Sequence, residues 1–191
     1  MTFPELCHSC GACVRACPEQ ALVETSREIG TVRTGRAGNV LVVDGVLDVG
    51  QPRAVPLIEA VLRRAPSAQV TVVDAPPGTS CSVTAALRGA EAVVLVTEPT
   101  PFGLHDLDLG LRLVRMLGIR PLAVINRSDL GDDRVRRHLE QERVPVVAEV
   151  PFDREIARVY ARGWIVAREV PRFRDAVERL AVALAAEGKE A

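Results

Sequence analysis

Short apolar runs alternate with amphipathic segments along most of this chain. The apolar runs, each typical of a buried strand, are Val70–Val73, Ala92–Thr97, Leu122–Ile125 and Val144–Val150. The segments with helical spacing are Ala54–Arg64, Ser82–Arg88, Leu104–Leu117, Asp132–Glu142, Asp153–Arg162 and Arg172–Ala186. Strands and helices that alternate in this way predict an α/β fold with a parallel sheet covered on both faces.

The first fifty residues have a different pattern. Between Ile29 and Gly50, short Val, Ile and Leu pieces alternate with glycines, which predicts a hairpin and a connection rather than a helix. The regular rhythm starts at Ala54, so the natural boundary lies near Gly50–Arg53. We therefore predict two domains, residues 1–50 and residues 51–191.

Composition narrows the class of protein. The 191 residues are 48% hydrophobic, enough for a substantial core. A net charge of -1 gives no electrostatic reason to expect nucleic acid or an anionic membrane, and 3% aromatic residues are too few for base-stacking platforms. The start, Met1–Leu6, has neither the basic nor the apolar stretch of a signal peptide, and no run is long enough to cross a bilayer. We expect a cytoplasmic protein without nucleic-acid or membrane partners.

Four of the five cysteines fall close together near the N-terminus. Cys7, Cys10, Cys13 and Cys17, followed by Pro18, have the C-x-x-C-x-x-C-x-x-x-C-P spacing of a bacterial ferredoxin run. In two-cluster ferredoxins the first three cysteines of such a run hold one cluster and the fourth holds the other, so one run is half of a site. The spacing predicts that these four residues are iron–sulfur ligands, with Cys7, Cys10 and Cys13 holding a 4Fe–4S cluster whose usual fourth ligand is missing.

Two other interpretations of the cysteines are weaker. Disulfides or unused thiols in a loop are a poor explanation, because five cysteines cannot staple a 191-residue chain that has its own core. A zinc ion accepts four thiolates, but its ligands usually come as two separated C-x-x-C pairs. Cys81 stands apart from the run, and we interpret it as a small packed residue.

Polar residues follow the predicted strands at the positions where open parallel sheets bind ligands. Asp74 follows Val70–Val73, and an aspartate there can hold Mg²⁺ through water, as in P-loop NTPases. A glycine at position 78 can let the following loop respond to a phosphate. Asn126 opens the sequence Asn-Arg-Ser-Asp after Leu122–Ile125, close to the Asn-Lys-x-Asp pattern by which many NTPases hold a nucleotide base.

Each of these segments also has a purely structural interpretation. Pro76-Pro77-Gly78 makes a turn in any protein. Asn126 could be a turn residue, and Ser128, Asp129 or Asp132 a helix N-cap. Asp153, after the last predicted strand, is an N-cap candidate as well. The residues by themselves leave these alternatives open.

The chain resembles the MinD/Mrp-type P-loop ATPases that carry an inserted ferredoxin domain, relatives of the nitrogenase iron protein. The segments that carry the resemblance are Cys7–Cys13, Val72–Cys81, Val96–Gly103, Val124–Asn126 and Val150–Ala157. It implies a doubly wound, P-loop NTPase-like sheet in which Asp74 lies near Mg²⁺ and Gly78 belongs to the phosphate-sensing loop. It also implies that Asn126, Pro151 and Phe152 flank the adenine of ATP.

The chain departs from that family at the phosphate loop. It has no G-x-x-x-x-G-K-[ST] sequence and no Lys-Gly-Gly variant, and its only lysine is Lys189. In the family an N-terminal part supplies this loop, the first strand and the other cysteine run. We therefore expect the chain to be a C-terminal portion that lacks the first strand and needs an N-terminal complement. The C-terminal C-x-x-C of scaffold-type Mrp proteins is also absent.

These observations lead to one main functional expectation. The chain is expected to be the iron–sulfur-binding portion of a MinD-like ATPase that couples nucleotide state to cluster redox or assembly, with ATP and Mg²⁺ bound only together with the missing part. Its expected partners are that N-terminal portion or a second copy of the chain, and an electron-transfer or client protein. The alternatives are a non-catalytic ferredoxin-like electron-transfer or interaction subunit and, less well supported, a zinc-bound structural protein.

Overall fold

The computed structural model describes residues 3, 7 and 9–187 of the chain. Most of the Met1–Leu6 stretch and Lys189 lie outside the described residues. The chain divides into two compact units, Met1–Val61 and Leu62–Ala191. None of the described helices is both long and apolar enough to cross a membrane.

The first unit contains a short helix and a hairpin. The helix α1 spans Ala12–Ala16, and the strands β1 (Gly30–Ala37) and β2 (Val40–Leu47) pair antiparallel. Ala37 pairs with Val40, which leaves a two-residue Gly38–Asn39 turn with Gly38 at φ 59°. Glycine and asparagine are the residues that such tight hairpin turns favour. The hairpin predicted for residues 29–50 is confirmed.

Helix α2 (Val55–Arg64) begins after the hairpin and packs on it. A Cβ atom at Gly45 in β2 would lie 2.9 Å from both Leu57 Cγ and Val61 Cγ2. A side chain at Gly45 would therefore push the helix away from the strand. This close approach fixes the start of α2 against the hairpin.

The second unit is an α/β structure. Its strands are β3 (Ala92–Thr97), β4 (Arg120–Asn126) and β5 (Val146–Val150). Its helices are α3 (Cys81–Ala86), α4 (Pro101–Met116), α5 (Arg134–Gln141), α6 (Arg154–Ala161), α7 (Val166–Glu169) and α8 (Pro171–Glu187). Within the described residues the strands form one parallel sheet in the order β3-β4-β5.

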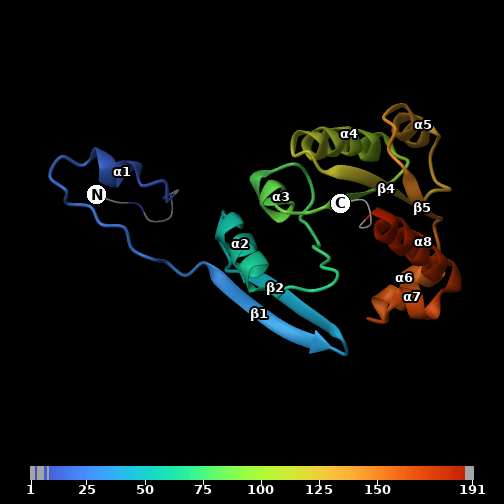
Figure 1. The fold of residues 1–191 in the computed structure, drawn as a ribbon, viewed down its shortest axis with the longest axis horizontal. Coiled ribbons are helices and arrows are strands. Elements are labelled where there is room, and N and C mark those ends of the chain that lie inside the picture. Colours follow the sequence, from blue (N-terminus) through green and yellow to red (C-terminus); the bar gives the residue numbers. More distant parts are fainter. Residues whose placement is uncertain (1–2, 4–6, 8, 188–191) are drawn as a thin grey trace. The chain divides into compact units, whose positions relative to one another are not determined.

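Helices cover both faces of this sheet (Figure 1). On one face, Leu107 and Leu111 of α4 and Leu139 of α5 pack with Ala123 and Ile125 of β4. On the other face, the cluster combines Val124, Ala148 and Val150 with Ile156, Phe173 and Ala176 from α6 and α8. Successive residues of β4 thus face opposite layers, as a strand buried on both sides requires. The predicted α/β fold with a covered parallel sheet is confirmed for three strands.

The prediction of a strand at Val70–Val73 is wrong. These residues form an irregular segment between α2 and α3, and Val72 is 86% exposed. A short strand is stable only when its backbone groups pair with a neighbour. Within the described part of the chain no strand pairs with this segment, so its apolar pattern alone does not order it. Asp74 consequently does not follow a strand in this structure.

Asp153 is the N-cap of α6, as predicted, and it also ties two helices together. Its Oδ1 accepts a hydrogen bond of 2.7 Å from the amide of Glu155. Its other oxygen forms an ion pair with Arg172 in the first turn of α8, and the Asp153 side chain is only 7% exposed. The cap therefore fixes the start of α6 next to the start of α8.

Replacing Asp153 should destabilise the second unit. Asp153→Ala removes the cap and leaves Arg172 without its carboxylate, so we expect the free energy of unfolding to fall by about 1–3 kcal/mol. Asp153→Asn keeps an acceptor oxygen and should cost less. Urea unfolding followed by circular dichroism measures both.

Asp133→Ala is the matched control for this experiment. Asp133 is the N-cap of α5, but its side chain makes no capping hydrogen bond and only an exposed ion pair with Arg136, 3.1 Å away. Equal losses for Asp133→Ala and Asp153→Ala would mean that the cap and the Arg172 pair contribute nothing specific.

Candidate functional site

The four clustered cysteines are arranged around α1. Cys13 lies inside this helix, Cys17 caps its C-terminus, and Cys7 and Cys10 precede it. All four thiols are free; the first three are exposed and Cys17 is partly buried. The sulfurs are therefore accessible to an incoming metal.

The backbone turns sharply between the cysteines, and backbone amides within and after the run donate hydrogen bonds to two of the sulfurs. Ser9 (φ 51°) and Gly11 (φ 68°) take the left-handed conformation. The amide of Ser9 donates to Cys7 Sγ at 3.4 Å, and the amide of Ala21 donates to Cys17 Sγ at 3.4 Å. Hydrogen bonds to sulfur stabilise thiolates and help to set the potential of iron–sulfur clusters.

The chemistry of this donor set fits an iron–sulfur cluster, since soft thiolates are its usual ligands. Among the described residues, however, no three His, Cys, Asp or Glu side chains lie close enough together to hold a metal ion. The ligand shell is thus not assembled in this structure. The assignment of Cys7, Cys10, Cys13 and Cys17 as ligands stays a prediction.

The second candidate site lies at the carboxyl edge of the β3-β4-β5 sheet. We call it the sheet-edge site and define it as Glu98, Asn126, Arg127, Asp129 and Phe152. Asn126 is the last residue of β4, and its Nδ2 donates to Glu98 Oε1, just after β3, at 3.3 Å. The Nε of Arg127 lies 3.5 Å from the same oxygen of Glu98.

Two hydrogen bonds attach the segment after β4 to the end of β5. The amide of Ser128 donates to the carbonyl of Val150 at 3.0 Å, and the amide of Phe152 donates to Asp129 Oδ1 at 2.6 Å. In addition, Asn126 and Val150 are register partners. The backbone of Pro151 and Phe152 therefore follows directly on the register partner of Asn126, and the Phe152 side chain is half-exposed.

Arg136 in α5 stabilises the contact between the segment after β4 and strand β5. Its guanidinium donates to the carbonyl of Ser128 at 2.9 Å and to both carboxylate oxygens of Glu149 at 3.0 and 2.6 Å. These hydrogen bonds hold the pKa of Glu149 below its usual range and raise the pKa of Arg136. One cation thereby connects the loop after β4 with β5. Neither Arg136 nor Glu149 was predicted as part of a site.

Asp74 and Gly78 lie in the irregular segment between α2 and α3, and both are exposed. Gly78 has φ 87°, a left-handed conformation that suits a turn. The sheet-edge contacts described above involve neither residue. Their predicted roles near Mg²⁺ and phosphate are not tested by this placement and stay predictions.

Sequence reasoning missed Glu98. The signal that could have found it is its position, because it directly follows β3 and the carboxyl ends of parallel strands lie at one edge. Asp132, one of the predicted caps, accepts from the amide of Arg134 at 3.0 Å, but the N-cap position of α5 is Asp133, so this prediction is one residue off. Asp129 instead binds Phe152, so the structural interpretation of Asp129 as a cap is wrong.

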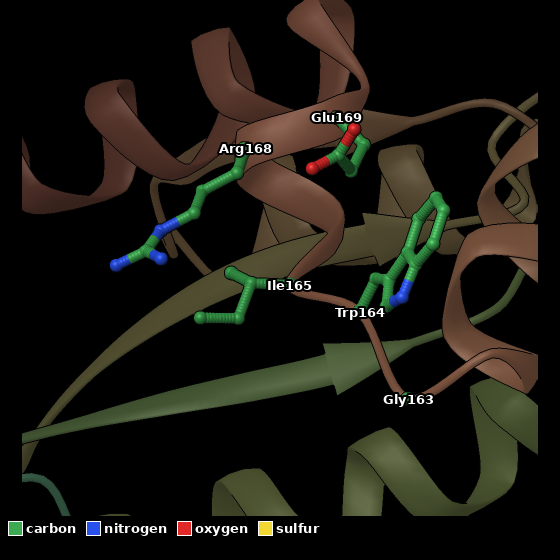
Figure 2. A pocket seen from close by; sticks show the side chains of 5 residues that line it. All are labelled: Gly163, Trp164, Ile165, Arg168 and Glu169. Atoms are coloured by element: carbon green, nitrogen blue, oxygen red, sulfur yellow. The ribbon is translucent and has the colours of Figure 1, made fainter. Parts of the chain in front are cut away.

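A further surface feature lies between α6 and α7. Gly163, Trp164, Ile165, Arg168 and Glu169 line an open hollow of about 400 Å³, and Figure 2 shows Arg168 and Trp164 pointing in different directions. The Trp164 side chain is about half-exposed, and the guanidinium carbon of Arg162 lies 5.3 Å from its ring centre. None of the predicted site residues lines this hollow.

Comparison with known proteins supports the iron–sulfur prediction. Residues 2–23 match the family described as "4Fe-4S binding domain". The match contains all four clustered cysteines and supports a 4Fe–4S cluster in this segment. No solved structure gives a significant match to the chain.

Two relatives come from Methanocaldococcus jannaschii. The chain is 26% identical to "Uncharacterized protein MJ0579" over 161 residues, which cover 83% of this chain and 55% of the relative. It is 22% identical to "Uncharacterized protein MJ0578" over 156 residues, which cover 81% of this chain and 54% of that relative. The chain thus spans about half the length of the curated relatives it matches, and their names carry no activity.

The pair between Arg136 and Glu149 should make stability depend on pH. A carboxylate with a lowered folded pKa contributes stability above its ordinary pKa of about 4.5, and the contribution is lost as the pH falls through the lower, folded value. Both side chains are more than a third exposed, so Glu149→Gln should cost less than about 1 kcal/mol at neutral pH. The difference in free energy of unfolding between wild type and Glu149→Gln, measured with urea, should shrink below pH 4.5.

Glu140→Gln makes the same change on the exposed side of α5. It should leave the pH dependence of unfolding unaltered. A Glu149→Gln curve that runs parallel to wild type at every pH would show that the pair does not link protonation to folding.

Proposed function

We propose that this chain is the iron–sulfur-binding portion of a MinD-like ATPase, in which nucleotide state is coupled to cluster redox or cluster assembly. The observation that carries the iron–sulfur half is the match of residues 2–23 to a 4Fe-4S binding family. Cys7, Cys10, Cys13 and Cys17 are the proposed ligands. A bound cluster of this kind supplies one-electron transfer.

The sheet-edge site supports the nucleotide half of the proposal. Asn126 stands at the end of the central strand, and Phe152 is half-exposed two residues after its register partner Val150; in the proposal the two side chains meet the edge and the face of a purine base. Asp74 and Gly78 are the proposed contacts of Mg²⁺ and phosphate. In this proposal the three-stranded sheet is part of a doubly wound, P-loop NTPase-like sheet.

The proposed partner is an N-terminal ATPase portion that supplies the phosphate loop and a strand, or a second copy of the chain, which can supply a strand but no phosphate loop. The outer edge of β3 is unpaired in the described part of the sheet, and the apolar Val70–Val73 segment is exposed. A strand placed between them would pair with both. The relatives are also about twice as long as the part that aligns with this chain. A cytoplasmic location belongs to the same proposal.

The second candidate function is a non-catalytic ferredoxin-like subunit for electron transfer or protein interaction. The observation that favours it is the exposed position of Asp74, which does not follow a strand. In this case the cluster serves an electron-transfer or client protein and the sheet binds no nucleotide. ATP binding distinguishes the two candidates.

Anaerobically purified protein should be brown and contain iron and sulfide. Cys10→Ser should lower the iron content at least about tenfold, because a thiolate ligand is lost. Cys81→Ser is the matched control, since Cys81 is free and lies outside the run; it is exposed, so the interpretation of Cys81 as a packed residue is wrong, and its replacement should leave iron unchanged. Metal analysis and the visible spectrum measure both. Stoichiometric zinc without sulfide would refute the iron–sulfur proposal.

By itself the chain should bind Mg-ATP weakly and show no turnover, since it has no lysine-containing phosphate loop. Co-expression with an N-terminal fragment that bears a Lys-Gly-Gly loop should give a soluble complex that hydrolyses ATP. In that complex, Asp74→Ala should abolish turnover. Calorimetry and phosphate release measure these outcomes.

Two results would contradict the ATPase proposal. One is micromolar ATP affinity of the chain alone, which would mean that it holds phosphate without the loop. The other is a stable monomer that ignores such a fragment, which would favour the non-catalytic subunit.

A further inference from the structure

The turn that follows β3 is held in place by its own hydrogen bonds. Thr97 is only 6% exposed, and its Oγ1 donates to the carbonyl of Gly103 at 3.0 Å. The amide of Gly103 in turn donates to Thr100 Oγ1 at 3.0 Å, and the amide of Thr100 donates to the carbonyl of Glu98 at 2.7 Å. Glu98 therefore sits in a rigid turn between β3 and α4.

Close backbone contacts secure this turn on two sides. A Cβ atom at Gly103 would collide with the backbone oxygen of Glu98. A Cβ atom at Gly131, which has φ 82°, would collide with the backbone oxygen of Pro99. The start of α4 and the loop before α5 thus both touch the turn at positions where only glycine fits. This packing fixes the backbone from which the Glu98 side chain extends.

Glu98 directs a single oxygen at two residues of the sheet-edge site. Its Oε1 accepts from Asn126 Nδ2 at 3.3 Å and lies 3.5 Å from Arg127 Nε. Arg127 has φ 48°, a conformation that is costly for a non-glycine residue and persists where its surroundings fix it. The contacts with Glu98 therefore orient both side chains.

The Glu98 carboxylate determines the orientation of the Asn126 side-chain amide. An ionised carboxylate only accepts hydrogen bonds, so it must face the NH₂ group of Asn126 and not its oxygen. The Oδ1 of Asn126 is then the group that remains for a ligand. Such an oxygen accepts a hydrogen bond and cannot donate one.

We propose that Glu98 is a positioning residue that sets the base preference of the sheet-edge site: by holding Asn126 Nδ2, it leaves an acceptor that fits the exocyclic amine of adenine and opposes the O6 oxygen of a 6-oxopurine. Adenine presents a donor at this position and guanine an acceptor. The inference rests on the proposed function, in which Asn126 lies at the base.

One oxygen of the Asp129 carboxylate is bound within the protein. Guanine also presents N–H donors, which a free carboxylate would recognise. In this structure Asp129 Oδ1 accepts from the amide of Phe152 at 2.6 Å and is therefore engaged by the backbone. The site thus presents the Asn126 amide oxygen to an amine, while the backbone of Phe152 holds one of the two Asp129 oxygens.

Adenosine and inosine are suitable probes for this inference. They differ in having an amine or an oxygen at position 6, and they carry no phosphate, so binding does not need a phosphate loop. Each nucleoside is titrated separately into the ¹⁵N-labelled chain. The side-chain amide signals of Asn126 are the readout. Wild type should prefer adenosine by about threefold to tenfold, the value of one hydrogen bond.

Glu98→Gln should bring the preference close to one, because a glutamine presents either a donor or an acceptor and lets the Asn126 amide turn over. Glu98→Ala removes the carboxylate altogether and should have the same effect, so the test does not depend on one variant folding. Glu91→Gln is the matched control: Glu91 is exposed just before β3, at the opposite end of that strand. It should keep the wild-type preference.

The outcomes separate this inference from the proposed function. If both Glu98 variants keep the preference for adenosine, the role of Glu98 is wrong while nucleotide binding stands. If wild type binds neither nucleoside, or prefers inosine, the inference is overturned together with the adenine assignment of Asn126. The iron content of wild type and Cys10→Ser reports on the iron–sulfur half independently.

Discussion

In the second unit, β4 has a neighbour on each edge and a helical layer on each face. Its residues Leu122, Ala123 and Ile125 are at most 1% exposed, and it pairs in parallel with β3 and β5. Because the three strands run the same way, their carboxyl ends meet at one edge, and the segments that follow them converge there. The position of β4 therefore determines whether Glu98, Asn126 and Phe152 meet.

Much of the fold of the second unit could be predicted from the sequence, because its pattern is local. The bounds of Ala92–Thr97 agree with the observed strand, and the predicted helices differ from the observed ones by only a few residues at their ends. Val70–Val73 shows the limit of such reasoning. Its residues have a strong preference for strands, but strand formation also requires a pairing partner, which a local pattern does not contain.

The candidate sites differ in how far the sequence predicted them. The cysteine run is recognised from spacing alone, since all its ligands come from one short segment, whereas the geometry of the sulfurs depends on their surroundings. The convergence of Asn126 with Phe152 follows from the rule about strand ends. The contact between Glu98 and Asn126 joins residues 28 positions apart, and that between Arg136 and Glu149 joins residues 13 apart, so both needed the folded structure.

Trp164 gives the molecule a built-in optical reporter. It is the only tryptophan in the chain, it lies between α6 and α7, and it is half-exposed with the guanidinium of Arg162 over its ring. Indole emission depends on solvent contact and on nearby charge. The intrinsic fluorescence of the whole protein therefore comes mainly from this one loop, and its wavelength reports, without any label, on changes in how α6 and α7 are packed.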